Sequence, residues 1–408
     1  MKRWLQMFNN PDKNKKNKSK KKNKKKLNKT SRTLLNMMAR LPKNSKVIVF
    51  ESFFGKQYSC NPRAIYEELR EKYPKYTFYW SIDHRYKDTF KKHGLNTVPR
   101  FTLRWFLIMM RAKYWVFNSR LPKWMPKPEN TVYLQTWHGT PLKKLALDMD
   151  EVYMPGTTTK KYKRNFVAEA KRWNYLVSPN PYSSEIFKRA FKFKRKLLET
   201  GYPRNDFLTN YTDEDVEAIR KHINIPEGKK VILYAPTWRD NEYHFIGMYK
   251  FALKMDLDKM RDEFGDDYVI LLRLHYLISD HLDIKKYEGF AYDVSNYEDI
   301  RELYVVSDLL ITDYSSVMFD YGILKRPMIF FAYDIDNYRD KLRGFYFDFE
   351  HEAPGPIVQN TEEILDEIRH VNTIRMRYKR ECSQFEQRFH SLEDGRAAEK
   401  VVKKVFKK

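Results

Sequence analysis

Residues 309–331 have the sequence LLITDYSSVMFDYGILKRPMIFF. A short apolar run, Leu309–Thr312, opens this stretch, and a second one, Met328–Phe331, closes it, with a helical segment between them. Nearly continuous apolar runs joined by a helix are typical of parallel strands that are buried on both faces. The stretch therefore predicts a β-α-β unit inside an α/β domain.

The same alternation extends outward along the chain. In the C-terminal half, Val231–Ala235 and Val269–Leu274 are further apolar runs that predict buried parallel strands. In the N-terminal half the predicted strands are Val47–Phe50, Phe78–Ile82, Tyr114–Asn118 and Val132–Thr136. We also expect one helix capped by Asn61-Pro62 that runs toward Tyr73, and another that Asn180-Pro181 opens.

These patterns predict two sheet-containing domains with additions at both ends. We expect a disordered polybasic tail at 1–30, an N-terminal domain at 31–215, a C-terminal domain at 216–375 and C-terminal helices at 376–408. The linker between the domains is expected within 204–228. The apolar stretch 101–114, which also carries arginine and lysine, is interpreted as a core helix, with a membrane-facing amphipathic helix as the alternative.

Composition points to an anionic partner. The 408 residues carry a formal net charge of +25, which suits nucleic acid, a membrane surface or a phosphate-rich substrate. The two cysteines, Cys60 and Cys382, form neither a disulfide framework nor a zinc pattern, so a reducing cytosol fits best. No apolar run approaches the roughly 20 residues that span a bilayer, and the N-terminus lacks a signal-peptide core.

The first 30 residues contain much of the positive charge. Thirteen Lys and Arg less Asp12 leave +12 there, and almost no apolar residue follows Phe8. Such a segment cannot bury enough surface to fold. Each basic residue near an anionic leaflet contributes about 1 kcal/mol, so we expect the tail to bind the membrane rather than nucleic acid.

Several common catalytic patterns are absent from the sequence. It contains no Walker A loop, no G-x-G-x-x-G, no H-E-x-x-H and no G-x-S-x-G. Three D-x-D triplets, at 148–150, 256–258 and 334–336, are short enough to arise by chance. We therefore expect no metal site and no cofactor.

Four polar motifs follow predicted strands, where open parallel sheets bind their ligands. The first is Trp137-His138-Gly139-Thr140-Pro141. A histidine titrates near neutral pH and can accept a proton from an attacking hydroxyl, so His138 is a candidate general base.

The second motif ends in Thr237-Trp238-Arg239, where Arg239 can bind a phosphate through two parallel hydrogen bonds. The third contains Arg273 and His275, which are two residues apart and therefore face the same side of an extended segment. Such a cationic pair suits a diphosphate whose charge shifts during a reaction.

The fourth motif, residues 312–316, offers the hydroxyls of Ser315 and Ser316 at a predicted helix N-terminus, which is an anion-binding position. Asp320, about one turn further on, is a candidate partner for a donor hydroxyl. The turn GYPRND, residues 201–206, is a further candidate that adds Arg204 to the cleft.

The order of these motifs resembles that of the CDP-glycerol:poly(glycerophosphate) glycerophosphotransferases. The motifs that carry the resemblance are WHGTP, GYPRND, YAPTWRD, the R-x-H pair and TDYSSVMFDYGILKRPMIFF. These enzymes are the primases and polymerases of teichoic acid synthesis in Gram-positive bacteria. The resemblance extends from about Lys46 to Val358 and excludes the tail and the extreme C-terminus.

The resemblance implies a GT-B architecture, in which two Rossmann-like domains face each other across a cleft. It implies CDP-glycerol as donor, CMP as leaving group, a lipid-linked disaccharide or glycerol phosphate as acceptor, and work at the cytoplasmic face of the membrane. His138 then corresponds to the general base, and Arg273 with His275 to the donor-phosphate site. The remaining donor contacts that we expect are Trp137, Gly139, Thr140, Pro141, Arg204, Thr237, Trp238, Arg239, Ser315, Ser316 and Asp320.

Three alternatives stay open at this point. CDP-ribitol or a nucleotide sugar could replace CDP-glycerol in the same pocket, and a basic nucleic-acid-binding protein is a remote possibility that only the tail supports. The sequence does not distinguish a primase from a polymerase.

Overall fold

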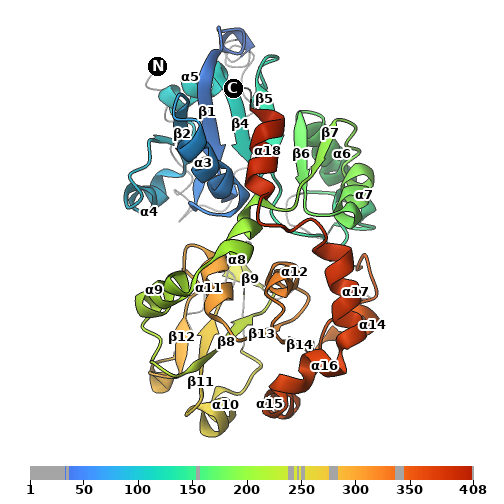
Figure 1. Ribbon diagram of the computed structural model, residues 1–408. Helices are drawn as coiled ribbons and strands as arrows, with labels where there is room; N and C mark the ends of the chain where they lie inside the picture. The colour runs from blue at the N-terminus through green and yellow to red at the C-terminus, as the bar shows by residue number, and fades with distance from the viewer. Residues whose placement is uncertain are drawn as a thin grey trace, which may run out of the picture.

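The computed structural model describes residues 33, 36–152, 157–237, 243–245, 248–249, 253–274, 284–335 and 344–406. The predicted tail at 1–30 lies outside these residues. Two parallel sheets with helices on their faces make up most of the described chain (Figure 1). This confirms the predicted α/β fold with two Rossmann-like domains.

The N-terminal sheet has seven parallel strands in the order β3-β2-β1-β4-β5-β6-β7. Their bounds are Asn44–Glu51 (β1), Thr77–Ile82 (β2), Thr97–Pro99 (β3), Ala112–Phe117 (β4), Val132–Gln135 (β5), Tyr175–Ser178 (β6) and Lys196–Glu199 (β7). All four strands predicted in this half are confirmed. β3, β6 and β7 are additional to the predicted strands.

The C-terminal sheet has six parallel strands in the order β12-β11-β8-β13-β14-β15. Their bounds are Lys230–Ala235 (β8), Tyr268–Leu272 (β11), Ala291–Asp293 (β12), Leu309–Thr312 (β13), Met328–Phe331 (β14) and Ile357–Val358 (β15). A separate antiparallel pair joins β9 (Tyr243–Phe245) to β10 (Met248–Tyr249). The four apolar runs predicted as strands in this half are all confirmed, and β12 and β15 are additional.

Helices connect and cover the strands. The α-helices are Cys60–Lys72 (α3), Lys87–Lys91 (α4), Leu103–Arg111 (α5), Thr159–Ala170 (α6), Pro181–Ala190 (α7), Asp206–Asn210 (α8), Asp213–Ile223 (α9), Leu257–Phe264 (α10), Ile300–Val306 (α11), Val317–Tyr321 (α12), Phe349–Glu352 (α14), Thr361–Arg369 (α15), Ile374–Arg377 (α16), Lys379–Phe389 (α17) and Ala397–Val405 (α18). The 3₁₀ turns are Phe53–Gly55 (η1), His84–Tyr86 (η2), Ala146–Asp148 (η3), Pro203–Asn205 (η4), Lys285–Tyr287 (η5), Gly322–Leu324 (η6) and Val371–Thr373 (η8).

One predicted helix cap is confirmed and the other is wrong. The Asn180 side chain accepts a hydrogen bond from the Ser183 N–H at the start of α7. By contrast, α3 begins at Cys60 after Ser59, and the amide of Asn61 points into the protein toward another loop. An asparagine before a proline is a good cap in sequence terms, but here a buried tertiary partner outcompetes the local one.

In each sheet, successive strands are added first on one side and then on the other, so the strand order has one switch point. The order runs outward from β1 and β4 in the first sheet, and from β8 and β13 in the second. Such a switch point leaves a crevice outside the carboxyl ends of the strands, where ligands bind. The polar motifs of the sequence follow β5, β8, β11 and β13, and so they lie at these edges.

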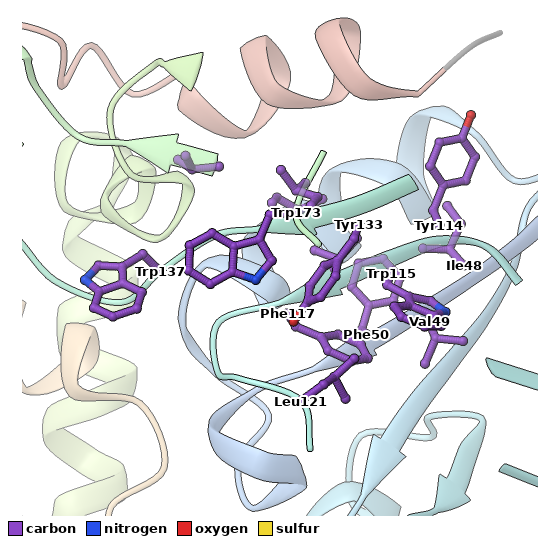
Figure 2. Packing of buried hydrophobic residues seen from close by; sticks show 14 of the residues in the cluster. Ile48, Val49, Phe50, Tyr114, Trp115, Phe117, Leu121, Tyr133, Trp137 and Trp173 are labelled. Atoms are coloured by element: carbon purple, nitrogen blue, oxygen red, sulfur yellow. The ribbon is translucent and has the colours of Figure 1, made fainter. Parts of the chain in front are cut away.

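Aromatic side chains fill the N-terminal core (Figure 2). Trp115, Phe117 and Tyr133 pack against one another with ring centroids 5.6–6.2 Å apart. Trp173 is also fully buried in this cluster. Much of the high aromatic content therefore serves packing, because large rings bury more apolar surface per residue than aliphatic side chains.

The last helix returns to the first domain. α17 contributes Phe385 and Phe389 to the core of the C-terminal half, whereas α18 places Val401 and Val402 in the core around β1 and β4. Figure 1 shows α18 beside the upper sheet and α17 beside the lower one. The chain thus crosses between the two halves twice, near η4 and again between α17 and α18. The domain bounds at 215 and 375 stay a prediction.

Within the described residues, no helix is long and apolar enough to cross a bilayer. The stretch 101–114 forms α5 and then enters β4. Trp105, Phe106, Met109 and Met110 of α5 are buried, as expected of a core helix.

We expect replacement of Phe406 by alanine to destabilise the N-terminal half, although this residue lies near the end of the chain. Phe406 is buried, with its ring 4.7 Å from that of Tyr114. A buried Phe→Ala change typically costs about 3–5 kcal/mol, because the cavity is only partly refilled. Urea denaturation measures this loss, and Met376→Ala, at a 71% exposed position, is the control. Equal stability of the two variants would contradict the packing of this segment.

Candidate functional site

A pocket of about 280 Å³ opens where the two halves face each other. The turn after β5 supplies one wall, and the turns after β8 and β13 supply the other. Of the predicted site residues, the structure brings together Trp137, His138, Gly139, Thr140, Pro141, Thr237, Ser315 and Ser316.

The two walls approach closely at Gly139. A Cβ atom built on Gly139 would lie 3.2 Å from Oγ of Ser316, which belongs to the other half of the molecule. Such a distance is tighter than an ordinary van der Waals contact. With a larger residue at position 139, the Ser316 side chain would have to shift by a few tenths of an ångström, so the His138 turn and the Ser315–Ser316 turn approach each other closely here.

The His138 ring is held in one tautomer. Its Nδ1 lies 2.8 Å from the carbonyl oxygen of Asn118, so Nδ1 carries the hydrogen and Nε2 has the free lone pair. Burial lowers the pKa of His138 to about 4, and the charges of Arg204 and Arg120 act in the same direction. A neutral imidazole with an available Nε2 is the form that a general base requires.

Side chains hold the carbonyl groups of the turn that carries His138. Arg204 donates to the carbonyl of His138 (2.9 Å), Tyr202 to that of Gly139 (3.0 Å) and Tyr182 to that of Pro141 (2.8 Å). The turn is therefore fixed from several elements before any ligand arrives, which is the preorganisation that electrostatic catalysis relies on.

Trp137 combines an unfavourable backbone conformation with a buried ring. Its φ of 52° lies in the left-handed region, which is uncommon for a residue with a large side chain. The ring stacks on the imidazole of His138 at 4.7 Å and packs against Phe191 at 4.8 Å. Trp137 therefore lines the pocket and at the same time anchors the turn to the core, and backbone strain of this kind is common at functional sites.

Arg204 and Asp320 contact each other and do not line the pocket around His138, although Arg204 lines the second pocket described below. Both side chains are buried, and the Arg204 guanidinium donates to the Asp320 carboxylate across the two halves. Although burial opposes the charge, the carboxylate raises the pKa of Arg204 above its ordinary value. Asn205 adds a hydrogen bond to the same carboxylate at 3.3 Å. Their predicted role as donor contacts stays a prediction.

Arg273 lines a second pocket, of about 530 Å³, on the neighbouring side of the cleft. Its guanidinium donates to the carbonyls of Val294 (2.5 Å) and Ser295 (2.7 Å), and burial lowers the pKa of Arg273. Phe53 also lines this pocket, and its ring lies 5.7 Å from that of His138. A residue of the second pocket therefore contacts the imidazole that lines the first.

The turns after β8 and β13 are bound to each other. The backbone N–H of Thr237 donates to Asp313 at 2.8 Å, and Thr312 Oγ1 donates to the carbonyl of Ala235 at 2.7 Å. The helix that follows Ser316, α12, has only five residues. The hydroxyls of Ser315 and Ser316, rather than a long-helix dipole, are what this wall offers to a ligand.

Three predicted contacts, Trp238, Arg239 and His275, lie outside the described residues. Among the described residues, no group of three potential metal ligands was found. The carboxylates of two D-x-D triplets have protein partners: Asp148 accepts from Arg189 and Tyr346, and Asp256 caps α10.

The sequence interpretation missed several residues that shape the site. Asn118, Gln135, Tyr182 and Tyr202 contact the His138 turn, and only the polarity of Asn118 and Gln135 at the ends of apolar strands gave a signal. Asn61 also contacts this turn, whereas its position before a proline predicts a helix cap.

Comparison with known proteins identifies relatives over nearly the whole chain. The family model for CDP-Glycerol:Poly(glycerophosphate) glycerophosphotransferase matches residues 33–407. The chain is 57% identical over 379 residues to a teichoic acid poly(glycerol phosphate) polymerase of Bacillus subtilis (strain 168), covering 93% of this chain and 51% of the relative. The chain thus spans about half the length of that protein.

A second relative has a similar length. A teichoic acid glycerol-phosphate transferase of Staphylococcus aureus is 49% identical over 378 residues, covering 92% of this chain and 96% of the relative. By contrast, a teichoic acid poly(ribitol-phosphate) polymerase of Bacillus spizizenii is 28% identical over 371 residues, covering 90% of this chain and 57% of the relative.

The solved structure of the wall teichoic acid polymerase TagF superimposes with a TM-score of 0.85 at 48% sequence identity, covering 92% of each chain. Another TagF structure is of a histidine variant soaked with CDPG. With matches of this extent in both sequence and structure, the chain belongs to the CDP-glycerol:poly(glycerophosphate) glycerophosphotransferase family.

Proposed function

We propose that this protein transfers glycerol phosphate from CDP-glycerol to a hydroxyl group of a lipid-linked teichoic acid precursor and releases CMP. The observation that carries the proposal is the position of His138. Its neutral imidazole, bonded through Nδ1 to Asn118, lines one cleft with Thr237, Ser315 and Ser316 from the other half. Family membership supplies the reaction class that this geometry fits.

In the proposed reaction, the acceptor oxygen attacks the β-phosphorus of CDP-glycerol while Nε2 of His138 accepts the hydroxyl proton. A new P–O bond forms to the acceptor, and the bond from the β-phosphorus to the bridging oxygen breaks with departure of CMP. Arg273, together with Arg239 and His275 from outside the described residues, would stabilise the charge on the diphosphate. The hydroxyls of Ser315 and Ser316 face the same space.

Glycerol is the favoured polyol of the donor. Two relatives named for glycerol phosphate are 57% and 49% identical to the chain, whereas the ribitol-phosphate polymerase is 28% identical, as is one glycerol-phosphate primase. CDP-ribitol is the second candidate donor, and a nucleotide sugar is a weaker one. Measuring CMP or nucleoside diphosphate release from each donor with a lipid-linked acceptor distinguishes the three.

We also propose that the protein acts as a peripheral protein at the cytoplasmic face of the cell membrane. The residues 1–30 carry a net charge of +12, which suits an anionic leaflet. The outer side of α5 adds a mixed surface, with Leu103 40% and Leu107 41% exposed beside the exposed Arg104 and Arg111. Exposed leucines flanked by arginines are typical of a helix that rests in the membrane interface.

His138→Ala should lower the rate of CMP release by on the order of 10² or more, because the proton of the attacking hydroxyl would lose its acceptor. Steady-state CMP release from CDP-glycerol with a lipid-linked acceptor measures the effect, with a thermal melt to show that the variant is folded. Near-normal turnover by the folded variant would remove His138 from the mechanism.

The pH dependence of kcat/KM should reflect the lowered pKa of His138. Because the pKa of His138 lies near 4 rather than 6.5, the base stays neutral as the pH falls from about 7 to about 5. We expect kcat/KM for CDP-glycerol to decline only as the pH approaches the lower value, since this parameter reports the free enzyme. An acid limb at 6.5 or above would contradict the lowered pKa and the neutral state of the imidazole.

The double variant Leu103→Asp, Leu107→Asp should bind vesicles of anionic lipid at least about tenfold more weakly, since each leucine loses its apolar contact and a negative charge replaces it. Co-sedimentation measures binding, and Met376→Asp, on α16, is the matched control at an exposed apolar position. Removal of residues 1–30 should weaken binding separately. Unchanged sedimentation of the double variant would exclude α5 from the membrane contact.

A further inference from the structure

Asn61 contacts the His138 turn from outside it. The residue is fully buried, and its Nδ2 donates to the carbonyl oxygens of Thr136 (3.1 Å) and Trp137 (3.2 Å). Its Oδ1 accepts from the backbone N–H of Arg204 at 3.1 Å. The NH₂ group of Asn61, which can donate two hydrogen bonds, thus donates both to the two backbone carbonyls that immediately precede His138.

These two carbonyls flank the strained residue of the turn. Trp137 has a φ of 52°, and its N–H donates to Oε1 of Gln135 at 3.0 Å. Asn61 and Gln135, with Thr136 Oγ1, which also donates to the Trp137 carbonyl at 3.2 Å, satisfy the polar backbone atoms on either side of this conformation. A residue with a Cβ stays in the left-handed region only where its surroundings over-determine it, and these hydrogen bonds supply that constraint.

The conformation of Trp137 decides where the next side chain points. With the peptide between Trp137 and His138 oriented as it is here, Nδ1 of His138 lies 2.8 Å from the Asn118 carbonyl oxygen. Without Asn61, the Trp137 carbonyl would keep the hydrogen bond from Thr136 Oγ1 (3.2 Å) but lose the one from Asn61, and we expect the peptide to relax toward a more favourable φ and to move the imidazole away from Asn118.

We propose that Asn61 is a positioning residue for catalysis, which holds the Trp137 backbone so that the His138 imidazole presents Nε2 to the cleft. The proposal rests on the proposed function, in which His138 is the general base. Asn61 itself touches neither the pocket around His138 nor, in this role, the substrate. Its effect is transmitted through two backbone carbonyls.

Asn180 offers a matched control. It is also a fully buried asparagine at the start of a helix, and its Nδ2 donates to a carbonyl in the other half of the molecule, that of Phe389, at 3.0 Å. Its Oδ1 accepts from the Ser183 N–H. Replacing either asparagine removes comparable buried hydrogen bonds, but only Asn61 is bonded to the His138 turn.

The test compares Asn61→Ala and Asn61→Ser with Asn180→Ala in the full chain, measuring CMP release from CDP-glycerol as a function of pH. We expect the Asn61 variants to lose about tenfold or more in kcat, with KM for CDP-glycerol within about twofold of the parent. Their acid limb in kcat/KM should rise toward pH 6.5. The charged groups that face His138, Arg204 and Arg120, are retained in all variants, so the shift would report a change in the ring's burial and hydrogen bonding.

The same Asn61 change is then made in a His138→Ala background. If Asn61 acts only through the imidazole, it causes no further loss there, since the two effects are not additive. Equal losses with and without His138, an unmoved acid limb, or the same profile from Asn180→Ala would overturn the proposal. So would failure of both Asn61 variants to fold, which would make the residue structural. Near-normal turnover by His138→Ala alone would instead refute the proposed function on which this role rests.

Discussion

The guanidinium of Arg204 is the point through which the two halves of the molecule are joined at the cleft. The guanidinium donates to the Asp320 carboxylate in one half and to the His138 carbonyl in the other. The backbone carbonyl of Arg204 accepts a hydrogen bond from Arg301 at 3.1 Å. A buried charge pair gains little over an apolar contact, but an unpaired partner typically costs about 3–5 kcal/mol. The pair therefore favours the relative placement of the two sheets in which both partners are satisfied.

Further ion pairs reinforce this placement beside Arg204. Arg63 of α3 donates to Asp299 at 3.0 Å, and Arg301 bonds to the same carboxylate. Although burial opposes ionisation, Arg301 and Arg63 lower the pKa of Asp299 to about 2. The network is thus charged throughout the neutral range. It lies on the Arg273 side of the cleft, so the position of the second pocket depends on it.

The chemistry of the site follows from what these constraints hold in place. A neutral imidazole, several hydroxyls and a half-buried guanidinium meet around two adjoining pockets, and the backbone between them is already bonded. Groups that are fixed before the substrate binds need no reorganisation when charge develops on the phosphate. The strain at Trp137 and the close approach at Gly139 are the local consequences of fitting these groups together.

Much of this protein was accessible from local sequence patterns. Apolar runs such as Leu309–Thr312 identify buried strands, because a strand covered on both faces can contain few polar residues. Polar motifs directly after such runs mark the ligand-binding edge, since the carboxyl ends of parallel strands meet there. His138, Thr237 and Ser315 were found in this way, and the family resemblance was carried by the same motifs.

Other features are invisible in the sequence because they depend on partners far apart in the chain. Nothing near Asn61 indicates that its amide bonds to residues 136 and 137, and nothing near Arg204 indicates a pairing with Asp320. The short strands β3, β6 and β7 are stable only as neighbours in a sheet, and α18 is placed by the core of the first half. The sequence by itself determined the type of fold and the residues at the strand ends. Only the tertiary structure decided which polar groups meet, because a buried hydrogen bond is selected by its partner in space and not by its neighbours along the chain.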